Sequence, residues 1–68
     1  GTSPFAFITE RRLARAKALL REPNLSITQI ALEVGMSHSH FSRSFLRHVG
    51  VSPREFRSRE LHAPKPPA

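Results

Sequence analysis

The stretch that decides the fold runs from Ser26 to Gly50 and reads SITQIALEVGMSHSHFSRSFLRHVG. Its first part has apolar residues at positions i, i+3, i+4 and i+7 between Ile27 and Val34, which predicts a short helix with one buried side. Gly35 is expected to end this helix, because glycine readily adopts the left-handed conformation found at helix C-termini. The stretch therefore predicts two short helices joined by a tight turn.

The second helix of this pair is expected to begin after Ser37, a good N-cap, and to continue to about His48. The apolar side chains expected to face the core are Phe41, Phe45, Leu46 and Val49. With these inward, His40, Arg43 and Arg47 project outward with Ser39 beside them, and His38 and Ser42 lie at the edges. The outward side is therefore cationic or hydrogen-bonding and carries no acid.

Further helices are expected on both sides of this pair. Ser3 can cap a helix that begins at Pro4 and continues to about Arg21, with a length of roughly 27 Å. Its expected inward arc consists of Phe5, Ile8, Leu13, Ala16, Leu19 and Leu20. A fourth helix is expected from Pro53 to about Leu61. Because no strand pattern competes, we expect an all-α fold, a three- to four-helix bundle with a long N-terminal helix.

A pattern of seven residues, G-x-S-P-x-x-F, occurs twice, at residues 1–7 and 50–56. Such a repeat predicts two related modules, of which the first is represented here by its closing turn. We therefore expect residues 1–22 to be the end of a first subdomain and a linker helix. Residues 23–61 would then be a complete second subdomain, and residues 62–68 a proline-rich, disordered tail.

The charge balance favours a polyanionic partner. The 68 residues include eleven Lys and Arg but only five Asp and Glu, a formal net charge of +6. No acid lies between Gly35 and Arg54, whereas a solvated helix face usually mixes both signs. Two short helices joined by a turn also form the helix-turn-helix pattern of DNA-binding proteins, the alternative being an ordinary helical hairpin. Arg43 is the candidate for base readout, unless it touches only backbone phosphate.

Three segments, residues 27–37, 39–45 and 50–57, resemble the second helix-turn-helix of AraC/XylS-type bacterial transcription regulators. Residues 11–20 resemble the linker helix of that family. The resemblance implies a homeodomain-like fold and a sequence-specific DNA-binding part of a bacterial transcription regulator, such as an activator. The recognition helix, about residues 38–48, would lie in the major groove.

The same resemblance implies a set of contact residues. Those expected to face DNA bases are His38, Ser39, His40 and Arg43, and those expected near phosphates are Ser37, Ser42 and Arg47. Double-stranded DNA is the expected partner, with RNA polymerase as a further one. We expect a cytoplasmic protein without a cofactor, whose effector-binding or dimerisation domain lies outside this chain.

Other functions have less support from the residues. No nucleophile, base and acid occur together, so we expect no enzyme activity. His38 and His40 diverge by about 200° on a helix, so we expect no metal site. No apolar run approaches the roughly 20 residues of a membrane span. The remaining alternative is a helical protein-interaction module that contacts RNA polymerase or a partner regulator.

Arg12 lies next to the apolar arc of the first helix, where a charge needs a partner. Two interpretations remain equal at this point. Either Arg12 pairs with Glu33, or its side chain extends to solvent or to a phosphate.

Overall fold

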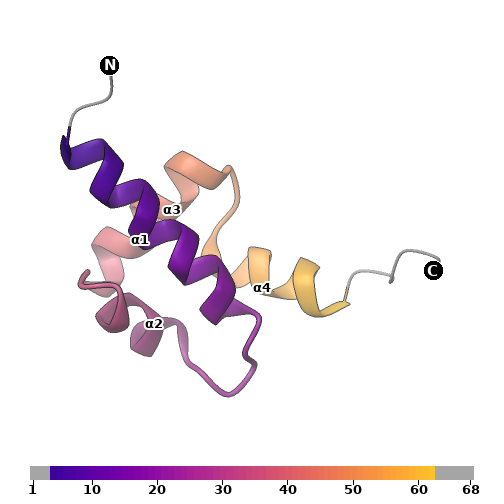
Figure 1. Cartoon of the computed structure of the whole chain (residues 1–68). Helices are drawn as coiled ribbons and strands as arrows, with labels where there is room; N and C mark the ends of the chain where they lie inside the picture. The colour runs from indigo at the N-terminus through magenta and orange to yellow at the C-terminus, as the bar shows by residue number, and fades with distance from the viewer. Residues whose placement is uncertain (1–3, 63–68) are drawn as a thin grey trace.

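The computed structural model describes residues 4–62, which form four helices around one core (Figure 1). These are α1 (Pro4–Leu20), α2 (Ile27–Glu33), α3 (His38–Val49) and α4 (Pro53–His62). No strand occurs between residues 4 and 62. The predicted all-α class is confirmed, and each observed helix end lies within one residue of its expected place.

Some of our predictions concern residues at the two ends of the chain, which the structure describes only in part. The predicted N-cap Ser3, the first three residues of the repeat at 1–7, and residues 63–68 lie outside the described residues. His62, which we assigned to the tail, is the last residue of α4.

Serine side chains define where the later helices begin. The Ser26 hydroxyl accepts a hydrogen bond from the Gln29 backbone N–H (3.0 Å), and the Gln29 side-chain oxygen accepts one from the Ser26 N–H (2.8 Å). Such a reciprocal capping box satisfies two backbone donors that the helix leaves unpaired. Ser37 and Ser52 cap α3 and α4 in the same way through one hydrogen bond each. Local sequence therefore determines these three helix starts.

Gly35 forms the turn between α2 and α3. Its N–H donates to the Leu32 carbonyl (3.0 Å), and the Met36 N–H donates to the Ala31 carbonyl (2.9 Å). Gly35 has a φ of 77°, the left-handed conformation that this pair of bonds requires. The Met36 side chain is buried directly after the turn. The expected role of Gly35 is confirmed.

Replacing Gly35 with alanine is expected to lower the free energy of unfolding by about 1–2 kcal/mol, because a Cβ disfavours the left-handed conformation. The new Cβ would lie 3.6 Å from Cζ of Arg12, an ordinary contact, so the loss comes from the backbone. Urea denaturation followed by circular dichroism measures it. Gly35→Asn is the control, because asparagine tolerates this conformation better and should lose less. Equal stability of Gly35→Ala and the unchanged chain would refute this explanation.

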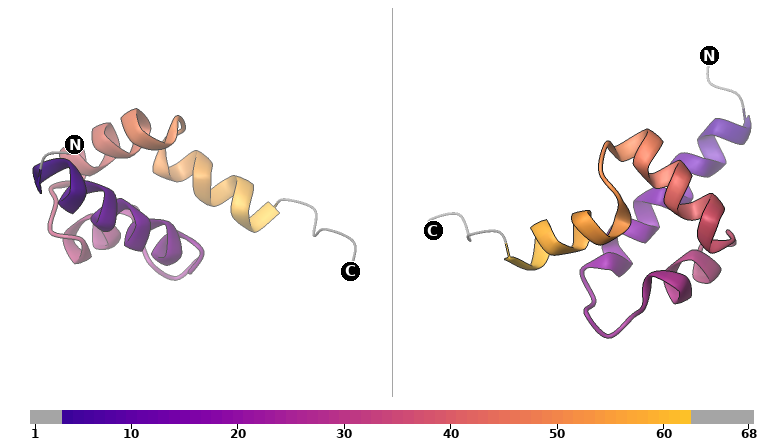
Figure 2. Two further views of the ribbon diagram at one scale, coloured as in Figure 1. Left: turned by 45° about the horizontal axis from the view of Figure 1, so that its top comes forward. Right: turned by 180° about the vertical axis from the view of Figure 1, so that it is seen from behind.

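The core lies where the four helices meet. Its buried apolar side chains are Leu13, Ala16, Leu20, Ile30, Ala31, Val34, Met36, Phe41 and Phe45. The Phe45 ring centroid lies 5.6 Å from that of Phe41 and 5.5 Å from that of Phe56 on α4. α1 and α3 each pack against both α2 and α4. Figure 2 shows that α4 projects to one side of the other three helices.

Three residues that we expected in the core are exposed instead. On α1, Phe5 is 74% exposed and Ile8 is 49% exposed, whereas the neighbouring Thr9 is buried. The first turns of α1 extend past α2 and α4 (Figure 1). α3 lines an open concavity with Phe5 and Thr9 but leaves Phe5 and Ile8 largely exposed. On α3, Leu46 is 52% exposed. Amphipathic spacing identifies which side of a helix is apolar, but cover depends on how far the neighbouring helices extend.

Glu33 pairs with Arg15, so the interpretation in which Arg12 pairs with Glu33 is wrong. Its carboxylate lies 3.8 Å from the Arg15 guanidinium, and both side chains are more than half exposed. Arg12 instead directs its guanidinium to the Gly35 carbonyl oxygen, at 3.5 Å. On α1 the side chain of Arg12 lies over the α2–α3 turn, so the nearest acceptor is a carbonyl of that turn.

Arg57 joins α4 to the segment that follows α1. Its Nε donates to the Leu20 carbonyl (3.0 Å), and its Nη2 donates to the carbonyls of Glu22 (3.1 Å) and Leu25. These carbonyls include the end of α1, where the helix dipole favours a cation. The sequence pattern that contains Arg57 did not predict this role.

Candidate nucleic-acid interface

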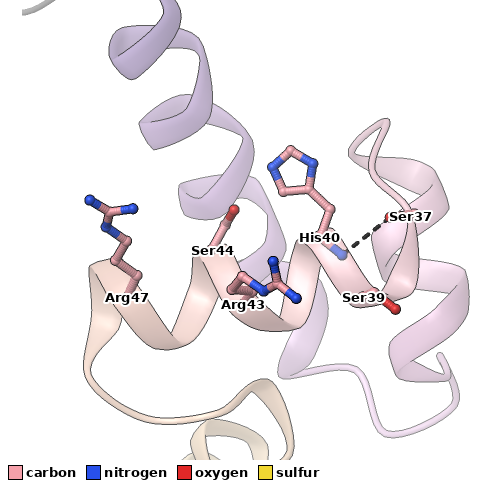
Figure 3. Close-up of a pocket in the computed structure, with 6 residues that line it drawn as sticks. All are labelled: Ser37, Ser39, His40, Arg43, Ser44 and Arg47. Carbon is pink, nitrogen blue, oxygen red and sulfur yellow. Dashed lines mark hydrogen bonds between the residues drawn. The ribbon is translucent and has the colours of Figure 1, made fainter.

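The outer side of α3 is defined by the two phenylalanines on its inner side. Phe41 and Phe45 are both 0% exposed, so residues half a turn away face outward. His40, Arg43 and Arg47 are exposed there. In Figure 3, His40 and Arg47 point to the same side of α3, and Arg43 lies between them along the helix. The predicted orientation of these three side chains is confirmed.

One side of α3 forms an open concavity. It is lined by Ser37, Ser39, His40, Arg43, Ser44 and Arg47. Five of the seven predicted contact residues therefore lie together on one surface. Ser37 uses its oxygen to cap α3, at 3.2 Å from the His40 N–H, and its hydroxyl hydrogen can still be donated. Sequence analysis missed Ser44, although it follows His40 by four residues, the spacing of neighbours on a helix.

The other two predicted contact residues, His38 and Ser42, line a different concavity. Its remaining lining residues come from the first turns of α2 and α4 and from the capping serine before each, namely Ser26, Ile27, Thr28, Ser52, Pro53 and Arg54. Sequence analysis gave Thr28 and Arg54 no role. The only signal that pointed to Arg54 was its place at the end of the acid-free stretch.

The arginines divide into two groups. Within residues 4–62, five of them make a hydrogen bond or ion pair with another residue, namely Arg12, Arg15, Arg21, Arg57 and Arg59, and Arg11 lies over the Phe7 ring at 5.9 Å. Arg43, Arg47 and Arg54 have no hydrogen bond or ion pair within that range. All three belong to α3 or the first turn of α4 and line the two concavities. These unpaired guanidinium groups are available to bind an external anion.

The described residues provide neither a metal site nor a membrane-spanning helix. No group of three or more His, Cys, Asp or Glu side chains in that part of the chain is placed to hold a metal ion. None of its four helices is long and apolar enough to cross a membrane.

Residues 1–59 match a protein-family model described as a helix-turn-helix domain. The chain is also 43% identical over 58 residues to the HTH-type transcriptional regulator ExsA of Pseudomonas aeruginosa, covering 84% of this chain and 21% of ExsA. It belongs to the AraC/XylS family of transcription regulators. A crystal structure of an AraC-type transcriptional regulator from Chromobacterium violaceum superposes with a TM-score of 0.86 at 38% identity, covering 94% of this chain and 58% of that one.

A second AraC/XylS relative has the same extent of similarity. The HTH-type transcriptional activator RhaS of Escherichia fergusonii is 43% identical over 58 residues, covering 84% of this chain and 21% of RhaS. The chain thus spans about a fifth of the length of these curated relatives. Family membership confirms the helix-turn-helix fold and makes this chain a DNA-binding part of a transcription regulator. It does not favour the alternative of a separate protein-interaction module.

Proposed function

We propose that α3 is the recognition helix of this AraC/XylS chain and lies in the major groove of DNA. The proposed base contacts are His38, Ser39, His40 and Arg43, and the proposed phosphate contacts are Ser37, Ser42 and Arg47. The main support is the set of unpaired arginines on an acid-free surface. Of the six other arginines in the described range, five have a hydrogen-bond or ion-pair partner inside the chain, and Arg11 lies over the Phe7 ring. A phosphate backbone would supply the missing counter-charge.

We also propose that α1 links two DNA-reading subdomains, of which residues 23–61 are the second. With 17 residues, α1 is about 26 Å long, so with its turns it could span much of the roughly 34 Å between successive major grooves. The exposed apolar side chains of Phe5 and Ile8 fit a helix that contacts a further domain. We further propose that the protein acts in the cytoplasm without catalysing a reaction. Its expected further partner is RNA polymerase, and its effector-binding or dimerisation domain would lie outside this chain.

The first test is direct binding to DNA. We expect the 68-residue chain to bind a short, fluorescein-labelled duplex in the range of about 10⁻⁴ to 10⁻⁶ M at physiological salt, mostly without sequence preference. Fluorescence anisotropy at about 50 and 200 mM salt should show an affinity loss of orders of magnitude over that interval. No binding, or binding that salt leaves unchanged, would refute the proposal. Tight binding to one sequence by this chain alone would refute the two-subdomain part.

The role of Arg43 can be tested by selecting preferred sequences from a randomised pool of duplexes at low salt. If Arg43 binds a guanine edge, the unchanged chain enriches one G·C pair, with a discrimination of about 1–3 kcal/mol. Arg43→Lys keeps the charge but loses the planar pair of donors, so the enrichment should disappear while overall affinity changes little. Arg47→Lys is the matched control and should keep the enrichment. Unchanged enrichment with Arg43→Lys would mean that Arg43 contacts only phosphate.

A further inference from the structure

We infer that Arg54, together with the hydroxyl groups of Thr28 and Ser42, forms a second phosphate-binding surface, on the side of α3 away from Arg47. Through it the chain would hold both DNA backbones that border the groove occupied by α3. This inference rests on the proposed function, and it adds two residues, Thr28 and Arg54, to the proposed interface.

The two concavities lie on different sides of the same helix. Ser44 and Arg47 line the first, and Ser42 lines the second. Ser42 and Ser44 are two positions apart on α3, so their side chains diverge by about 200° around the helix axis. A helix about 10–12 Å wide fills a major groove of about 12 Å, and each of its sides then faces a different strand. The strand that faces Ser42 is not the one that faces Arg47.

The groups on the second side are free to bind an anion. Within residues 4–62, the side chains of Thr28, Ser42 and Arg54 make no hydrogen bond or ion pair. The acid closest in sequence is Glu55, whose carboxylate is bound to Arg59 at 3.1 Å. Glu55 therefore leaves the Arg54 charge without a partner in the described part of the chain.

Three helices bring these groups together. Thr28 lies in the first turn of α2, Ser42 in the middle of α3, and Arg54 in the first turn of α4. The cap made by Ser52 defines the start of α4 and so the position of Arg54 beside α3. A guanidinium and two hydroxyls can together donate several hydrogen bonds to the oxygens of one phosphate. No carboxylate lines this concavity to repel it.

The test compares Arg54→Gln with Arg59→Gln by fluorescence anisotropy on a short DNA duplex. Both variants remove one charge from exposed positions on α4. Loss of one phosphate contact should reduce the slope of log K against log salt by about 0.9, and the affinity at low salt should fall about three- to tenfold. Arg59→Gln should leave the slope unchanged, and Arg54→Lys, which keeps the charge, should retain it.

The outcomes separate this inference from the proposed function. If Arg47→Gln lowers the slope but Arg54→Gln acts no differently from Arg59→Gln, the second phosphate-binding surface is refuted and the proposed function stands. If the unchanged chain shows no salt-dependent binding, the proposed function itself fails. Thermal melting of each variant checks the fold. Because Arg54 has no partner within residues 4–62, the melting curve of the Arg54→Gln variant should superimpose on that of the unchanged chain.

Discussion

Replacing Phe45 with alanine is expected to lower the free energy of unfolding by about 3–5 kcal/mol, the range found for large-to-small substitutions of buried aromatic residues. Phe45 is 0% exposed and contacts the rings of Phe41 and Phe56, at centroid distances of 5.6 and 5.5 Å. The substitution removes the α3 side chain that contacts Phe56 on α4, and it leaves a cavity that neighbouring side chains fill only partly. Those two helices lose their contact at the centre of the core.

The loss is large compared with the whole stability of a chain this small. Domains have about 0.05–0.15 kcal/mol of stability per residue, so 68 residues provide about 3–10 kcal/mol. We therefore expect Phe45→Ala to be largely unfolded, with greatly reduced helical circular dichroism before any denaturant is added. Leu46→Ala is the matched control, since Leu46 is the adjacent residue and is 52% exposed. A Phe45→Ala variant as stable as Leu46→Ala would contradict the described core.

Replacing Arg57 with alanine is expected to lower the free energy of unfolding by about 2–3 kcal/mol, as for the loss of hydrogen bonds to a charged donor. The guanidinium bonds three carbonyls, those of Leu20, Glu22 and Leu25, across the end of α1 and the loop to α2. Two of these bonds are partly buried, so water replaces them incompletely. Without Arg57, the end of α1 and the loop to α2 lose three hydrogen bonds to α4 and keep the ion pair between Arg21 and Glu60.

Thermal melting measures this effect. In a domain of this size, 1 kcal/mol shifts the Tm by about 4–8 °C, so Arg57→Ala should melt roughly 10–20 °C lower. Arg57→Lys keeps the charge, but one ammonium group cannot reach all three carbonyls with the same geometry, so it should recover only part of the loss. Arg59→Ala removes an exposed ion pair with Glu55 from the same helix, which is expected to cost less than about 1 kcal/mol. Equal Tm values for the Arg57 and Arg59 variants would refute the role of Arg57.

Local features predicted the helices well. The capping serines Ser26 and Ser37, the turn glycine Gly35 and the prolines that begin α1 and α4 act within one turn of their own positions. Their effect therefore depends little on the rest of the molecule. The outward side of α3 was predictable for the same reason, because Phe41 and Phe45 recur at helical spacing and leave the cationic side chains opposite them.

Contacts between segments far apart in the sequence were less predictable. Arg12 and Arg15 both lie on α1 and contact α2 or the turn that follows it. Only the packing of α1 on α2 determines that Glu33 pairs with Arg15. Nothing in the pattern around Arg57 indicates that its donors reach carbonyls more than thirty residues earlier.

The sequence by itself determined the four helices, the turn at Gly35 and the cationic outer side of α3, because caps, backbone conformation and helical periodicity act over a few residues. Only the tertiary structure decided that Phe5 and Ile8 remain exposed. It likewise decided that Arg54 on α4 lines the same concavity as Ser42 on α3. It also decided which arginines have a partner among residues 4–62 and which face outward without one there. Burial and charge pairing depend on where whole helices lie, and the pattern of one segment does not contain that information.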